Sequence, residues 1–123
     1  MGRNNVRLKR VYDAPAQEDG VRILVDRVWP RGLTKDQAQV DEWLRELGPS
    51  TELRKWFGHD PARWEEFRAR YRTELVRPEQ RDRLDHLRGL VAKQQVTIVY
   101  GAKDTEHNQA VVIAEELGDR ARR

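Results

Sequence analysis

Four side chains that could bind a ligand or take part in chemistry stand close together in the sequence at the end of a predicted buried strand. Residues 21–29 begin as an apolar run rich in β-branched side chains, and Asp26, Arg27, Trp29 and Arg31 stand at its end. The planar fork of a guanidinium suits bidentate contact with phosphate or carboxylate, so Arg27 and Arg31 are candidates for binding an anion. The alternatives are a structural ion pair between Arg27 and Asp26, and a core position for Trp29.

Two histidines are candidates for metal ligation or proton transfer. His107 is expected in the first turn of the last helix, where the helix dipole disfavours protonation and leaves a neutral imidazole. His59 lies in a predicted loop after Trp56 and Phe57. A purely structural role is the plainer alternative for both histidines. His86 is expected on the surface, and no two histidines have the i, i+4 spacing of a local zinc site.

The residue inventory excludes several kinds of site. The chain has no cysteine, which excludes disulfides, zinc–thiolate sites, iron–sulfur clusters and covalently attached haem. It also lacks a Gly-x-Ser-x-Gly elbow, a phosphate-binding lysine loop and a dinucleotide fingerprint. A triad built on Ser50 has no local support. Lys103 and Asp104 are candidates for proton transfer. The alternative is that Asp104 caps the last helix and Lys103 is only its neighbour.

Composition indicates one small globular domain over residues 1–123, with ends that we expect to be frayed at 1–5 and 119–123. Basic residues number 24 and acidic residues 21, and this net charge of +3 does not by itself indicate nucleic-acid binding. No apolar run approaches the roughly 18 residues of a membrane span, and no signal-peptide pattern opens the chain. We therefore expect a cytoplasmic location.

The elements that must position these side chains are strands and helices in a mixed order. Strands are predicted at residues 6–12, 21–29 and 95–100, and the last two are apolar enough to be buried. Between them, capping residues and apolar spacing predict helices over 34–47, 51–57, 61–75 and 78–91.

Two of the helix predictions depend on particular residues. A Thr34-x-x-Gln37 capping box opens the helix over 34–47, and the spacing of Val40, Trp43, Leu44 and Leu47 gives it one apolar face. A last helix is expected after Asp104. Its inward side chains are predicted to be Ala110, Val111, Ala114 and Leu117, with Gly118 as C-cap.

This order predicts an α/β fold, in one three-layer domain with a small mixed, mainly parallel sheet. The two buried strands are joined by a long helical crossover, so they should be parallel. The strand over 6–12 is expected to pair antiparallel with the next strand through the loop 13–20. Parallel strands place 29–32 and 101–104 at one sheet edge, where open α/β sheets bind ligands.

Three segments of the chain resemble the YeaO-like proteins, a bacterial group that carries a domain of unknown function (DUF488). The segments are Leu24–Gly32, Pro49–Asp60 and Lys103–Ala110, the last containing His107 and Asn108. The likeness extends from Val6 to Leu117 and implies an intracellular α/β fold without a settled activity.

The resemblance also implies noncovalent binding of haem b, which is associated with one branch of the family. Axial ligation of the iron would then fall to His59 or His107, with Tyr100 as the weaker choice. Trp29, Trp56 and Phe57 would pack on the porphyrin. Arg27, Arg31 and Lys103 would hold its propionates, and Asn108 belongs to the same motif.

The sequence is therefore compatible with three functions. The first is a haem protein with the cofactor in the crevice at the strand ends, which binds small ligands or is weakly redox active. The second is an enzyme for a small anionic or phosphorylated substrate, with an arginine clamp and His107 as acid–base group. The third is a nucleic-acid-binding module, suggested by the basic first strand and tail.

Overall fold

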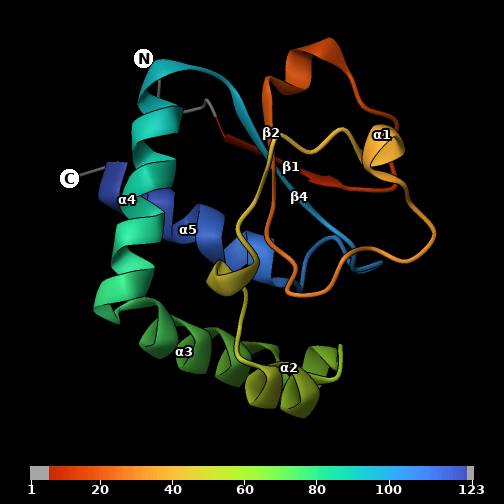
Figure 1. The fold of residues 1–123 in the computed structure, drawn as a ribbon. Coiled ribbons are helices and arrows are strands. Elements are labelled where there is room, and N and C mark those ends of the chain that lie inside the picture. The colour runs from red at the N-terminus through yellow and green to blue at the C-terminus, as the bar shows by residue number, and fades with distance from the viewer. Residues whose placement is uncertain (1–5, 122–123) are drawn as a thin grey trace.

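A four-stranded parallel sheet forms the centre of the protein (Figure 1). The computed structural model describes residues 6–121; residues 1–5 and 122–123, which belong to the ends expected to be frayed, lie outside the described residues. The strands are β1 (Val6–Arg10), β2 (Val21–Leu24), β3 (Glu42–Trp43) and β4 (Val96–Tyr100). Their order in the sheet is β1-β4-β2-β3.

The predicted α/β class is confirmed, but the predicted antiparallel pairing of the first two strands is wrong. β4 lies between β1 and β2, and Ile98 is the register partner of both Leu8 and Ile23. β2 also pairs with β3 in parallel. Because all of these strands run in one direction, their carboxyl ends meet at a single edge of the sheet.

Helices cover one face of this sheet. They are α2 (Thr51–Phe57), α3 (Trp64–Leu75), α4 (Pro78–Lys93) and α5 (Gln109–Ala121). Side chains of Ile23, Val25 and Ile98 pack with those of the helices in one buried cluster. Within residues 6–121, no helix combines the length and apolar character that a membrane span requires.

The other face has a thinner cover. Leu24 and Val99 point to this face and pack against Ala38 of α1 (Lys35–Ala38). The partly buried rings of Trp29 and Trp43 close this smaller core, with centroids 5.3 Å apart in an edge-to-face arrangement. The third layer is therefore one helical turn with its flanking loops.

The helix predicted over 34–47 is much shorter in the structure. The capping box is present, since Thr34 Oγ1 accepts from the Gln37 amide and Thr34 N–H donates to Gln37 Oε1. α1 nevertheless ends at Ala38, because Gln39 adopts a left-handed conformation with φ 48°. The chain then pairs with β2 as β3, and continues in the 3₁₀ turn Arg45–Leu47.

The last helix also differs from its prediction. α5 begins at Gln109, so His107 lies just before the helix, and Asn108 Oδ1 accepts from the amides of Ala110 and Val111 at its start. Its buried side chains include Val112 and Ile113, which were not predicted, beside the predicted Ala110 and Leu117. Val111 and Ala114, also predicted to point inward, are only partly buried. Gly118 lies inside the helix, which continues to Ala121.

The remaining helices confirm their predictions. Ser50 caps α2 through its hydroxyl, and Asp60 caps the short 3₁₀ turn Pro61–Arg63 that leads into α3. Buried Phe67, Tyr71 and Leu75 form one face of α3.

Candidate functional site

A cavity of about 300 Å³ lies at the carboxyl ends of β2 and β4, and we call it the strand-end cavity. This is the edge at which the sequence predicts a ligand. Its lining comes from Tyr12, 26–31, Pro49, Arg54, Phe57, His59, Phe67, 101–102 and 108–109. Seven of these 16 residues carry charged, imidazole or amide side chains, namely Asp26, Arg27, Arg31, Arg54, His59, Asn108 and Gln109.

β2 is shorter than predicted, and this places Asp26 in the cavity. The strand ends at Leu24, and one further ladder bond, from Val25 N to Val99 O, precedes Asp26. The carboxylate then turns across to β4, where Oδ2 accepts the Gly101 amide at 2.9 Å. A Cβ atom at position 101 would lie only 2.8 Å from Asp26 Oδ2, so a glycine is required there for this approach.

Asp26 is the acidic residue among those that line the strand-end cavity. Burial raises the pKa of its carboxyl from 3.8 to about 6. The hydrogen bonds from Gly101 and from the Gln109 amide nitrogen to Oδ1 act in the opposite direction, as do the positive charges of Arg54 and His59. A carboxyl with this pKa exchanges its proton near neutral pH.

Arg27 holds a wall of the cavity together. Its Nε donates to the carbonyl oxygens of Pro49 at 2.6 Å and Gly48 at 3.2 Å, and Nη2 contacts the Glu46 carbonyl at 3.4 Å. Neither of the predicted partners, an anion or Asp26, is needed to explain its position. Arg27 therefore lines the cavity, but backbone carbonyl groups occupy part of the hydrogen-bonding capacity of its guanidinium.

Arg31 and Arg54 are different, because their guanidinium groups form no hydrogen bond or ion pair with any residue in 6–121. Both are exposed at the mouth of the cavity. Arg54 is close enough to Asp26 to lower the pKa of that carboxyl. These two side chains have their full set of donors available for a ligand.

The two candidate histidines lie in different surroundings. His59 lines the strand-end cavity, is exposed, and adopts a left-handed backbone with φ 58° directly after Gly58. His107 is not a lining residue. Its Nδ1 is 2.9 Å from Asp104 Oδ2, and its ring packs edge-on against Trp64 with centroids 5.2 Å apart.

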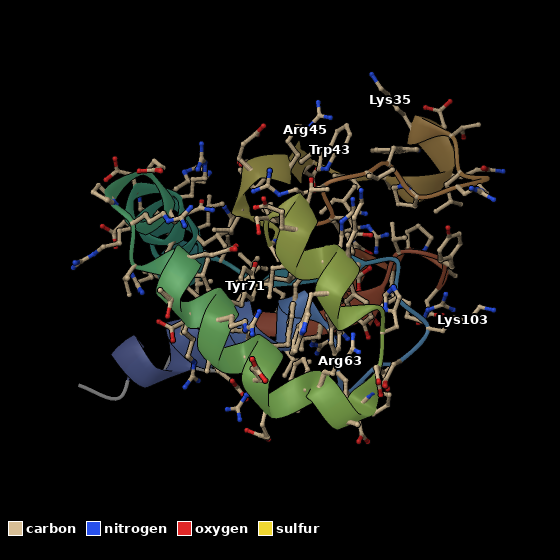
Figure 2. All side chains as sticks on the ribbon, turned by 90° about the horizontal axis from the view of Figure 1, so that it is seen from below. Lys35, Trp43, Arg45, Arg63, Tyr71 and Lys103 are labelled. Carbon is tan, nitrogen blue, oxygen red and sulfur yellow. The ribbon has the colours of Figure 1, made fainter. Side chains whose placement is uncertain are left out.

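The other predicted site residues divide in the same way. Trp29, Phe57 and Asn108 line the cavity, whereas Trp56, Tyr100 and Lys103 do not. Trp56 packs against the main core beneath the guanidinium groups of Arg63 and Arg70, and Tyr100 is buried. Lys103 is exposed at the periphery of the molecule (Figure 2).

Two lining residues carry no signal in the sequence pattern. Arg54 stands on the exposed side of a short helix among other charges, and Gln109 is one amide at the start of α5. The segment that contains Arg54 belongs to the family resemblance, but its spacing does not distinguish Arg54 from its neighbours. Only the position of α2 and α5 beside Asp26 identifies both residues.

The lining offers haem b one candidate axial ligand. Of the three candidate iron ligands, His59 lines the cavity, whereas His107 and Tyr100 do not. Among the residues that the structure describes, no group of three or more His, Asp or Glu side chains could hold a metal ion without a porphyrin. The lining is mixed, because its charged, imidazole and amide side chains stand among aromatic and apolar ones, as in many cofactor pockets.

The fold and the cavity thus define a small parallel α/β domain with a basic, ligand-sized cavity at its strand ends. The chain belongs to the YeaO-like DUF488 family: a family model described as "Inactive DUF488-N3 subclade" matches residues 5–123. This chain is 46% identical over 113 residues to "Uncharacterized protein YeaO" of Escherichia coli (strain K12), and the alignment covers 92% of this chain and 96% of that protein. It is 40% identical over 115 residues to "Uncharacterized protein Rv3073c" of Mycobacterium tuberculosis, covering 94% and 95%. No solved structure gives a significant match.

Proposed function

We propose that this protein binds a small organic anion in the strand-end cavity. The observation that carries the proposal is the pair of guanidinium groups, Arg31 and Arg54, which have no hydrogen-bond or ion-pair partner in residues 6–121 and lie at the mouth of one cavity beside the buried Asp26. Arginine pairs strongly with carboxylate and phosphate because its fork makes two charge-assisted hydrogen bonds.

The charge of the lining supports an anionic ligand. Arg27, Arg31 and Arg54 contribute three positive charges and Asp26 at most one negative charge, so these four side chains carry a net charge of +2 or more. The dipole of α5 adds to this field, because the helix begins at Gln109 in the cavity wall.

The free lone pairs of the Asp26 carboxylate indicate which hydrogen-bonding groups the rest of the ligand carries. Each of its carboxylate oxygens accepts one hydrogen bond from the protein and has a further lone pair available. A hydroxyl or amine on the ligand would satisfy that capacity at the inner end of the cavity. The best-fitting ligand is therefore an anion on a hydroxylated or aminated body.

The proposal is one of binding and includes no turnover. The description of the matching family model as an inactive subclade supports this choice. His107, the acid–base group of the sequence-based enzyme hypothesis, contacts Asp104 and Trp64 instead of lining the cavity.

Calorimetric titration with fructose 6-phosphate, a hydroxylated phosphate ester, tests the proposal. Arg54→Gln should weaken binding about tenfold or more, since it removes a charge-assisted contact worth roughly 1.5–3 kcal/mol. Arg77→Gln is the matched control, because it removes the same charge from the exposed start of α4. Equal affinity of both variants, or no heat with the unmodified protein, would contradict the proposal.

Haem binding stays a prediction, and the strand-end cavity gives it one supporting observation: His59 lies beside the aromatic ring of Phe57, with ring centroids 6.2 Å apart. Titration with haem, followed in the visible spectrum, separates the two ligands. A Soret band that His59→Ala abolishes would favour the haem protein; no band on addition of haem would remove it.

A further inference from the structure

A second cavity, of about 250 Å³, adjoins the strand-end cavity, and we call it the side cavity. It is lined by Arg27, Val28, Arg45, Glu46, Thr51 and Arg54. Three of these residues, Arg27, Val28 and Arg54, also line the strand-end cavity. The two cavities are therefore neighbours that share these three side chains, of which Val28 and Arg54 are exposed.

Arg45 is the residue that gives the side cavity its own chemistry. Its guanidinium carbon lies 4.6 Å from the centre of the Trp43 ring, and Figure 2 shows the two side chains together. This cation–π contact orients the guanidinium without using its N–H groups. No residue of 6–121 forms a hydrogen bond or an ion pair with those N–H groups, so they are available to a ligand.

The lining charges of the side cavity again favour an anion. Three arginines face one acidic side chain, Glu46, and Thr51 adds a hydroxyl that can donate a hydrogen bond. Trp43 also donates its ring N–H to the Asp26 carbonyl at 2.6 Å. The Trp43 ring, on which Arg45 packs, is thereby fixed to Asp26, next to the residues Arg27 and Val28 that line both cavities.

We propose that the ligand carries two anionic groups, phosphate or carboxylate, one bound in each cavity. The group in the side cavity is held by Arg45, and the group in the strand-end cavity by Arg31 and Arg54. The hydroxylated body between them passes over Val28 and reaches Asp26. This inference rests on the proposed function and deepens it, because it assigns the ligand class and adds Arg45 as a specificity-determining residue.

Titrations with fructose 6-phosphate and fructose 1,6-bisphosphate, each monitored by calorimetry at fixed ionic strength, test the inference. The bisphosphate should bind at least about tenfold more tightly. Arg45→Gln should abolish that advantage and leave the affinity for the monophosphate unchanged.

The control for Arg45→Gln is Arg63→Gln. Arg63 also packs on a tryptophan, with its guanidinium carbon 5.2 Å from the Trp56 ring centre, but it lines neither cavity. Arg63→Gln should keep the preference for the bisphosphate. Thermal unfolding of each variant shows that it is folded before its affinity is compared.

Each outcome has a distinct meaning. If the monophosphate binds but the bisphosphate binds no more tightly, or if Arg45→Gln keeps the preference, the inference is overturned while the proposed function stands. If neither sugar phosphate binds, the proposed function fails and the inference fails with it. If a single-stranded oligonucleotide binds more tightly than the bisphosphate and loses affinity in Arg45→Gln, the two cavities read a nucleic-acid backbone instead of a small molecule.

Discussion

Asp26 has a structural role in the folded protein, yet its burial destabilises its own ionised form. It holds the ends of β2 and β4 together through Gly101 and reaches α5 through Gln109, which is a structural task. Its burial at the same time raises its pKa to about 6, so its charged form is less stable in the folded protein than in the unfolded chain. The site therefore contains a group whose ionisation opposes folding.

This conflict predicts how stability depends on pH. A raised pKa contributes stability that is complete below the unfolded value of 3.8 and is lost as pH rises through about 6. Asp26→Asn is uncharged, and its amide can still accept from Gly101 and donate to Gln109. Between pH 4 and 7 the unmodified protein should lose up to about 3 kcal/mol of unfolding free energy relative to Asp26→Asn. Urea unfolding at both pH values measures this difference, and parallel pH profiles of the two proteins would refute it.

Arg27 and Arg31 are predicted to differ although both are arginines of one motif. Arg27→Gln should destabilise the fold by about 2 kcal/mol, because the carbonyl oxygens of Gly48 and Pro49 lose a charged donor. Arg31→Gln should leave the unfolding free energy unchanged and weaken only ligand binding, since its guanidinium forms no hydrogen bond or ion pair with any residue in 6–121. Denaturation and titration of both variants test the pair. The distinction would be wrong if Arg31→Gln destabilised the protein as much as Arg27→Gln.

At the scale of elements, short segments are held in place by side chains that come from far along the sequence. The loop before α2 is an example, since the Tyr71 hydroxyl donates to the Leu47 carbonyl at 2.6 Å and Glu74 accepts from the amide and hydroxyl of Ser50. With Arg27 on the other side, this loop forms a rigid wall of the strand-end cavity. The position of Arg54 follows from that wall, because α2 begins at its end.

α1 is held in a comparable way by a buried ion pair, and this leads to a stability prediction. Arg22 is 3% exposed; Nη1 lies 2.7 Å from Asp19 Oδ2, and Nη2 donates to the Ala38 carbonyl at 2.8 Å. Arg22→Met should cost roughly 3–5 kcal/mol, because it leaves the buried Asp19 with Lys9 as its remaining cationic partner. Adding Asp19→Asn should recover part of that loss in a denaturation experiment. No recovery in the double variant would show that the packing of Arg22, and not its charge, matters.

The predictability of these elements follows from how local their causes are. The caps at Ser50 and Asp60 and the apolar face of α3 depend on neighbours within a few residues, and the sequence indicates them directly. The spacing of Val40, Trp43, Leu44 and Leu47 suits a helix, but pairing with β2 and the left-handed Gln39 override it. That pairing is a long-range contact, which periodicity cannot report.

At the scale of the whole molecule, the parallel sheet determines where the site lies. The two apolar strands and their crossover predict the edge at which the strand-end cavity is found, together with the lining residues Arg31 and His59. Arg45, Arg54 and Gln109 are not predicted, because they reach the cavities only after helices and turns from three parts of the chain pack together. The location of a site in an α/β fold is thus easier to predict than the residues that complete it.

The most direct test of the account is to map ligand binding on the folded protein. In two-dimensional NMR spectra, addition of fructose 6-phosphate should shift the backbone amide signals of residues 26–31, 54–59 and 101–109. The signals of the outer side of α4 should stay in place, and the shifts should become smaller at high salt, because exposed charges are screened. An absence of shifts at millimolar ligand, or shifts confined to residues away from the strand-end cavity, would contradict the claim that this cavity binds an organic anion.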